Sequence, residues 1–189
     1  MGTLQGKKSR KETAPLHTLT MGYLAVMCSA FLLFPAAGGY ERIGDWAYFL
    51  WRGLSLAYLV LLALTAAEVA LTGGGRIKAL LAPLARLSVP RICLLVYVGW
   101  SALAAWCSPY EGVWQGLSRH AGLSTILLYA AVFWAVSAYG RWDDRFLWAL
   151  GAVTVFNAGI GLLQYAGYNP LGLFPEGTGY HDAFILYNG

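Results

Sequence analysis

The residues that can do chemistry in this chain are few, and most stand in short polar segments beside apolar runs. Those expected on the outer side of a membrane are Arg42, Asp45, Glu111, Arg119, His120, Glu176, His181 and Asp182. Arg119 is the best placed, because glycines lie on both sides of it just before an apolar run. Its planar guanidinium binds phosphate oxygens in pairs, which suits a lipid-linked diphosphate that gains charge as it leaves. An interfacial anchor, or a partner for Glu111, is the plainer alternative for Arg119.

The remaining polar residues indicate no standard catalytic or metal-binding set. His181 and Asp182 are adjacent, and adjacent tail residues do not face one another by default, so an acid–base pair is only one alternative for them. Histidines and carboxylates match no metal-ligand spacing, and Cys28, Cys93 and Cys107 match no metal or redox motif. Phosphate-binding glycine loops, dinucleotide fingerprints and nucleophile elbows are also missing from the sequence. We therefore predict no metal and no cofactor.

A polar stripe runs along the last apolar segment, residues 146–166. Its members recur every three or four residues, which places them on one helical face: Thr154, Asn157, Gly161, Gln164 and Tyr168. An amide that faces lipid leaves its donors unpaired, so Asn157 and Gln164 should face other helices or water. Two interpretations stay open. The stripe either joins helices in the membrane or forms one wall of a polar cleft.

Composition indicates that lipid solvates much of the chain. Hydrophobic residues make up 58% of the sequence and charged residues 12%, about half the charged share of an ordinary soluble domain. The net charge of +4 comes from basic residues in loops beside apolar runs, without the aromatic–basic pattern of a nucleic-acid-binding module. We predict an all-α integral membrane protein, with membrane lipid as a partner and no nucleic acid.

The apolar runs predict five transmembrane helices between residues 19 and 166. Their expected bounds are about 19–35, 46–72, 91–107, 121–139 and 146–166. A basic tail, residues 1–18, precedes the first, which is either a retained anchor or a signal peptide. Ten of the thirteen basic residues fall on the side of that tail, so the positive-inside rule places the amino terminus in the cytoplasm. Residues 167–189 then form an extracytoplasmic tail.

Charged residues near the second and third spans have interfacial explanations. Arg52 stands one to two turns inside the expected start of its span, where its stem can reach the interface, although a binding role is also open. Glu68 stands near the other end. Between these spans, residues 76–87 combine apolar residues on one face with Arg76, Lys78 and Arg86, which predicts an amphipathic segment on the cytoplasmic leaflet, kinked at Pro83.

Two segments resemble the O-antigen ligase/polymerase superfamily of bacterial membrane glycosyltransferases. The first is residues 116–123, GLSRHAGL, preceded by SPY at 108–110; it is similar to an outer loop in which a glycine, a basic residue and a second glycine precede a span. The second comprises residues 163–165 and 169–175, followed by Tyr180 and Asp182. The resemblance implies a GT-C-like helical fold in a bacterial inner membrane, of which this chain holds a partial bundle.

That resemblance also implies a reaction. The family transfers a glycan from an undecaprenyl-diphosphate carrier to an acceptor outside the cytoplasm, with arginines on the diphosphate and a histidine of a large later loop as base. The sequence ends before such a loop, so we expect an amino-terminal fragment that is inactive alone, with its catalytic residues elsewhere. The candidate substrate-binding residues are Arg119, His120, Asn157, Gln164 and Asp182. A non-catalytic membrane scaffold or a transporter fragment is the competing interpretation.

Overall fold

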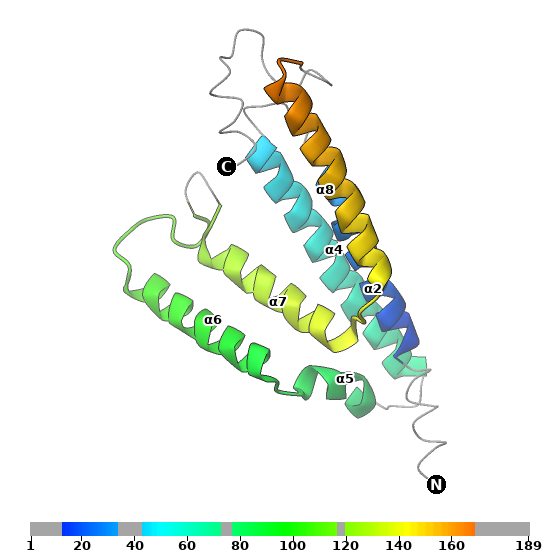
Figure 1. Cartoon of the computed structure of the whole chain (residues 1–189). Coiled ribbons are helices and arrows are strands. Elements are labelled where there is room, and N and C mark those ends of the chain that lie inside the picture. The colour runs from blue at the N-terminus through cyan, green and yellow to red at the C-terminus, as the bar shows by residue number, and fades with distance from the viewer. Residues whose placement is uncertain (1–12, 34–42, 73–76, 117–119, 169–189) are drawn as a thin grey trace. The chain divides into compact units, whose positions relative to one another are not determined.

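The structure is a computed structural model, and it describes residues 13–33, 43–72, 77–116 and 120–168 (Figure 1). Within these ranges every regular element is an α-helix. The helices are α2 (Ala14–Cys28), α3 (Ala30–Leu33), α4 (Ile43–Thr72), α5 (Ile77–Ala85), α6 (Val89–Cys107), α7 (Leu123–Tyr139) and α8 (Asp144–Tyr165). The prediction of an all-helical protein is confirmed for the part of the chain that is described.

In the described part of the chain, three helices are long and apolar enough to cross a membrane. They are Gly44–Thr72 in α4, Val89–Cys107 in α6 and the Asp144–Leu163 part of α8. Many of their large apolar side chains are exposed, for example Trp106 and Leu71, as expected for surfaces that contact lipid. α7 is a shorter apolar helix of 17 residues and α2 has 15. These helices indicate a membrane protein, while the count of five spans and the GT-C-like bundle stay predictions.

Residue contacts divide the chain into two compact units. One unit comprises residues 1–23 and 52–142, and the other comprises residues 24–51 and 143–189. The first holds the start of α2, most of α4, and the whole of α5, α6 and α7. The second holds α3, the start of α4 and α8, and its buried apolar side chains are Trp51, Val153 and Ile160. Each unit is described by itself below.

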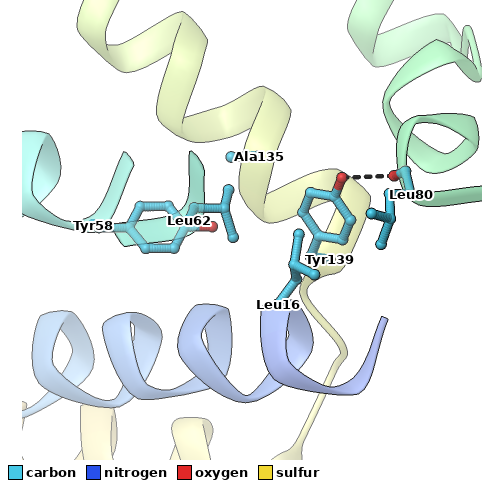
Figure 2. Close-up of a cluster of buried hydrophobic side chains, with 6 residues drawn as sticks. All are labelled: Leu16, Tyr58, Leu62, Leu80, Ala135 and Tyr139. Atoms are coloured by element: carbon cyan, nitrogen blue, oxygen red, sulfur yellow. Dashed lines mark hydrogen bonds between the residues drawn. The ribbon is translucent and has the colours of Figure 1, made fainter. Parts of the chain in front are cut away.

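The core of the first unit gathers side chains from four helices (Figure 2). It consists of Leu16, Tyr58, Leu62, Leu80, Ala135 and Tyr139, each at most 7% exposed. The Tyr139 hydroxyl donates to the Leu80 carbonyl oxygen over 2.8 Å, which ties α7 to α5. At the same helix end, the His17 ring Nδ1 lies 2.8 Å from the Tyr139 carbonyl oxygen, which ties α2 to α7. This core therefore fixes the ends of α2, α5 and α7 together.

Polar side chains line the contact between α2 and α4, where the sequence had indicated only ordinary span residues. The Thr20 Oγ1 lies 3.0 Å from the Tyr58 hydroxyl, and the Tyr23 hydroxyl lies 2.9 Å from Ser55 Oγ. The rings of Tyr23 and Tyr58 stack with centroids 4.3 Å apart. Because hydroxyls in an apolar layer need partners, these pairs fix the register of the two helices. We call Thr20, Tyr23, Ser55 and Tyr58 the α2–α4 seam.

Four helices, α2, α4, α6 and α8, begin earlier in the chain than the sequence predicted, and the difference is largest at α2 and α4. α2 begins at Ala14, so the end of the expected tail is helical, and Pro15 occupies the first turn, where its missing N–H costs nothing. α4 begins at Ile43, so Arg52 stands nine residues inside it, deeper than the predicted one to two turns. Arg52 is half-buried there. Its depth within the membrane span stays a prediction, because a helix can begin outside the membrane.

Candidate functional site

The predicted site residues fall in different parts of the chain. Arg119 and Asp182 lie outside the described residues, and only the backbone of Gln164 is described, in α8. His120 belongs to the first compact unit and Asn157 to the second. The assembly of these five residues into one site therefore stays a prediction. What the structure does describe is the loop on both sides of Arg119.

The loop between α6 and α7 begins as a tight turn. The amides of Gln115 and Gly116 both donate to the carbonyl oxygen of Gly112, over 3.1 and 2.7 Å. Gly112 has a φ of 81°, in the region that glycine enters without steric cost. Tyr110 directly precedes this turn and Trp114 lies within it. Both rings are exposed, at 79% and 58%, as is typical of aromatic residues at a membrane interface.

Two glycines close this loop against itself. Gly116 has a φ of 77°, and a Cβ atom placed there would lie 2.5 Å from the Ala121 nitrogen. A Cβ atom on Gly122 would lie 2.5 Å from the Trp114 carbonyl oxygen and would also meet the backbone of Gly116. Only glycine permits backbones to approach this closely. The glycines of the GLSRHAGL segment thus hold together the two ends of the short stretch that carries Arg119.

The loop also occupies the amides at the start of α7. The Leu123 and Ser124 amides donate to the carbonyl oxygens of Val113 and Trp114, each over 3.0 Å. Free amides at a helix start commonly bind phosphate, but these already have partners. An anion at the start of α7 must therefore be bound by side chains. The basic side chains of the loop would therefore have to bind such an anion.

His120 has an unusual backbone conformation. Its φ is 50°, in the left-handed region, which histidine enters more readily than most non-glycine residues. Its carbonyl oxygen accepts a hydrogen bond of 2.6 Å from Thr125 Oγ1, so the first turn of α7 holds the peptide between His120 and Ala121. The side chain of His120 is half-buried. The residue therefore helps to shape the loop, whatever its ring binds.

The polar stripe of α8 is described in part. Thr154 is exposed and its Oγ1 donates over 2.8 Å to the Leu150 carbonyl oxygen of its own helix. Asn157 is half-buried. A Cβ atom added to Gly161 would meet no atom of the described residues within 4 Å. Residues 154, 157, 161 and 164 of the stripe belong to α8, whereas Tyr168 lies beyond the end of that helix. Both interpretations, interhelical contact and cleft wall, stay predictions.

A buried arginine that the sequence analysis treated as a loop charge is the most constrained polar group in the structure. Arg91, in the first turn of α6, is 3% exposed. Its Nη1 donates to the carbonyl oxygens of Pro83 and Arg86, over 2.7 and 2.5 Å, and its Nε donates to Ser137 Oγ over 2.9 Å. Its guanidinium carbon lies 5.1 Å from the centre of the Trp134 ring. We call this three-helix contact the Arg91 junction.

The Arg91 junction compensates a buried charge without a carboxylate among the described residues. Pro83 and Arg86 stand at the end of α5, and Trp134 and Ser137 stand in the last turns of α7. Helix ends carry unpaired carbonyl oxygens and partial negative charge, which favour a cation. The Trp134 Nε1 also donates to the Leu84 carbonyl oxygen over 2.9 Å. Arg91 therefore fastens α5 to the end of α7.

Neither a metal site nor a known relative adds to this description. Within the described ranges, no three His, Cys, Asp or Glu residues are placed to share a metal ion. Comparisons of the chain with protein-family models, with curated proteins and with solved structures find no match. The function must consequently be argued from the chain's own residues.

Proposed function

We propose that this chain is the amino-terminal part of an O-antigen-ligase-like glycosyltransferase of a bacterial inner membrane. It would help to move a glycan from an undecaprenyl-diphosphate carrier to an acceptor on the extracytoplasmic face. Three apolar helices of spanning length and the sequence segments 116–123 and 163–175 support the proposal. In this arrangement the loop between α6 and α7 faces the carrier's diphosphate.

The observation that carries the proposal is the glycine-closed loop. Gly116 and Gly122 hold the ends of the Arg119 segment at the start of α7, and loop carbonyls occupy the α7 amides. The loop is thus built to present a side-chain cation rather than backbone donors. In glycan transfer an acceptor hydroxyl attacks the anomeric carbon, the bond to the diphosphate oxygen breaks, and the oxygen keeps the electron pair. Arg119 would stabilise that leaving charge.

Binding of undecaprenyl diphosphate to the purified chain in nanodiscs tests the assignment of Arg119. We expect Arg119→Ala to weaken binding about 10- to 100-fold, since a hydrogen bond to a charged group contributes about 1.5–3 kcal/mol. Arg119→Lys should retain part of the affinity, because it keeps the charge but loses the paired geometry. Arg141→Ala, which removes an exposed charge from the loop before α8, is the matched control.

Equal affinity of the Arg119→Ala variant and the unmodified chain would remove Arg119 from the site. Absence of diphosphate-lipid binding by the unmodified chain would favour the non-catalytic scaffold or transporter fragment. Where the chain is joined to a complementary catalytic part, glycan transfer provides a second measurement. There Arg119→Ala should lower transfer while leaving the amount of inserted protein unchanged.

A further inference from the structure

One side of α5 is docked on the first unit. Leu80 is 3% exposed and belongs to the core, and its carbonyl oxygen accepts from the Tyr139 hydroxyl. The carbonyl oxygen of Leu84 accepts from Trp134 Nε1, and that of Pro83 accepts from Arg91. These bonds hold both the middle and the end of the helix. The orientation of α5 about its own axis is therefore fixed.

The opposite side of α5 is exposed and largely apolar. Leu81 is 48% exposed, and Ala82, Ala85 and Arg86 are exposed as well. We call these four residues the α5 outer face. The segment that continues to α6 also exposes apolar side chains, at Leu87 and Val89. The sequence placed Leu80 and Leu81 on one apolar face, whereas the structure uses Leu80 for packing and leaves Leu81 outside.

The charge around the α5 outer face has a single sign. From Glu68 to Glu111 the sequence has no acidic residue, and it has four basic ones: Arg76, Lys78, Arg86 and Arg91. The carbonyl oxygens at the ends of α5 and α7 compensate Arg91. The positive charges of the other three residues have no acidic neighbour in this stretch of sequence. An exposed apolar helix face in a stretch of sequence whose only charges are positive suits a surface that is both apolar and anionic.

We propose that the α5 outer face lies in the membrane interface and binds anionic phospholipid headgroups. Leu81, Ala82 and Ala85 would contact the upper acyl chains, while Arg86 reaches the phosphates on its long stem. The Arg91 junction holds the helix in place, so its binding surface is formed before lipid arrives. The proposal is independent of glycan transfer, and of Arg119.

A fluorophore on the α5 outer face provides a local measurement. Ala82→Cys is labelled in a chain whose native cysteines, Cys28, Cys93 and Cys107, are replaced by alanine. The labelled protein is reconstituted in phosphatidylcholine with brominated phosphatidylglycerol, or with brominated phosphatidylcholine, as the quenching lipid. We expect brominated phosphatidylglycerol to be preferred at this position by at least about fivefold at low salt, the contribution of one basic residue near an anionic surface.

Charge variants and salt then test the source of that preference. The double variant Lys78→Gln and Arg86→Gln should bring the preference close to one, whereas the control Arg141→Gln should leave it unchanged. Raising the salt concentration from 0.05 to 0.5 M should lower the preference without any substitution, since salt screens interfacial charges. The salt titration tests the proposal even if the double variant fails to fold, because it needs no charge substitution.

Several results would overturn the proposal. Equal quenching by the two brominated lipids would show that α5 has no preference for anionic headgroups. Strong quenching by aqueous iodide, with none by either lipid, would place the helix in water. Protection from both, together with a disulfide between Ala82→Cys chains, would show that a second copy covers the face. Loss of the preference in Arg141→Gln would reveal a general charge effect with no role for α5.

Discussion

Arg91 and Arg119 stand in similar sequence contexts, but the described surroundings of Arg91 differ from those on the two sides of the segment that carries Arg119. Each lies close to the start of an apolar helix, α6 or α7. The guanidinium of Arg91 donates hydrogen bonds to carbonyl oxygens at the ends of α5 and α7. Its charge is therefore compensated within the protein. At Arg119, by contrast, the loop's own carbonyls satisfy the neighbouring amides, and glycines close the backbone on both sides.

This contrast separates an arginine that holds the fold from an arginine that is a candidate for binding. A buried guanidinium needs partners for its donors, and the Arg91 junction provides at least one for each of its three nitrogens. A ligand-binding guanidinium needs a fixed backbone and donors left for the ligand. Gly116 and Gly122 approach each other closely on the two sides of the segment that carries Arg119, which supports that assignment. The two regions should therefore respond oppositely to substitution, with stability lost at one and ligand affinity lost at the other.

The largest expected effect is on stability, at the Arg91 junction. Arg91→Met should lower the free energy of unfolding by about 3 kcal/mol, because it leaves buried carbonyl oxygens of Pro83 and Arg86 without donors. Unfolding by sodium dodecyl sulfate in mixed micelles, followed by circular dichroism, measures the change. Methionine is chosen because it keeps much of the length of the arginine side chain. The loss of stability then reflects the missing hydrogen bonds.

The matched control for this variant is Arg86→Met. Arg86 lies three residues after Pro83 in the sequence. The Arg86 side chain is exposed, and only its backbone oxygen takes part in the junction. Its replacement should change the unfolding free energy by less than about 0.5 kcal/mol. Equal losses from the two variants would mean that the charge of the segment matters and the junction does not.

The sequence predicted the helical class and the chemical type of the candidate residues, and it missed the Arg91 junction. Apolar runs long enough to span a bilayer are visible in any sequence, and so are glycines that bracket a cation. The partners of Arg91 are mostly backbone carbonyl oxygens. Every residue has one, so residue types in the sequence do not indicate which of them bind Arg91. Which helix ends meet depends on packing between α5 and α7, and that contact has no local sequence signal.

The next largest effect tests whether closure of the α6–α7 loop requires glycine. Gly122→Ala should lower the unfolding free energy by about 1–3 kcal/mol, because the added methyl group meets the backbone of Gly116 and Trp114. The same variant should weaken binding of undecaprenyl diphosphate even though Arg119 is intact. Denaturant titration and lipid binding, measured on the same preparation, distinguish the two consequences.

A glycine on an open helix face provides the comparison for Gly122. A Cβ atom on Gly99, within α6, meets no atom of the described residues within 4 Å. Gly99→Ala should therefore be neutral or stabilising by up to about 1 kcal/mol, since alanine favours the helix. If Gly122→Ala were equally harmless, the loop would close differently, and the geometric support for Arg119 would be lost.

The smallest expected effect concerns two threonines that make the same bond to their own helix. Thr20 and Thr154 each donate over 2.8 Å to the carbonyl oxygen four residues earlier. Thr20 is fully buried in the α2–α4 seam and also contacts the Tyr58 hydroxyl, whereas Thr154 is exposed in the stripe that the sequence singled out. Because both threonines make this bond, its loss contributes equally to the two substitutions. Any difference between their effects on stability therefore reports the interhelical contact of Thr20.

Thr20→Val should cost about 1 kcal/mol, and Thr154→Val less than about 0.5 kcal/mol. A cycle of Thr20→Val with Tyr58→Phe should give a coupling of about 0.6 kcal/mol, the average for hydrogen bonds between membrane helices. Unfolding in mixed micelles again provides the measurement. A larger loss at Thr154 than at Thr20 would show that the α8 stripe joins helices as strongly as the seam does. That outcome would favour interhelical contact over a cleft wall for Asn157 and Gln164, because a face that binds another helix cannot also border an open cleft.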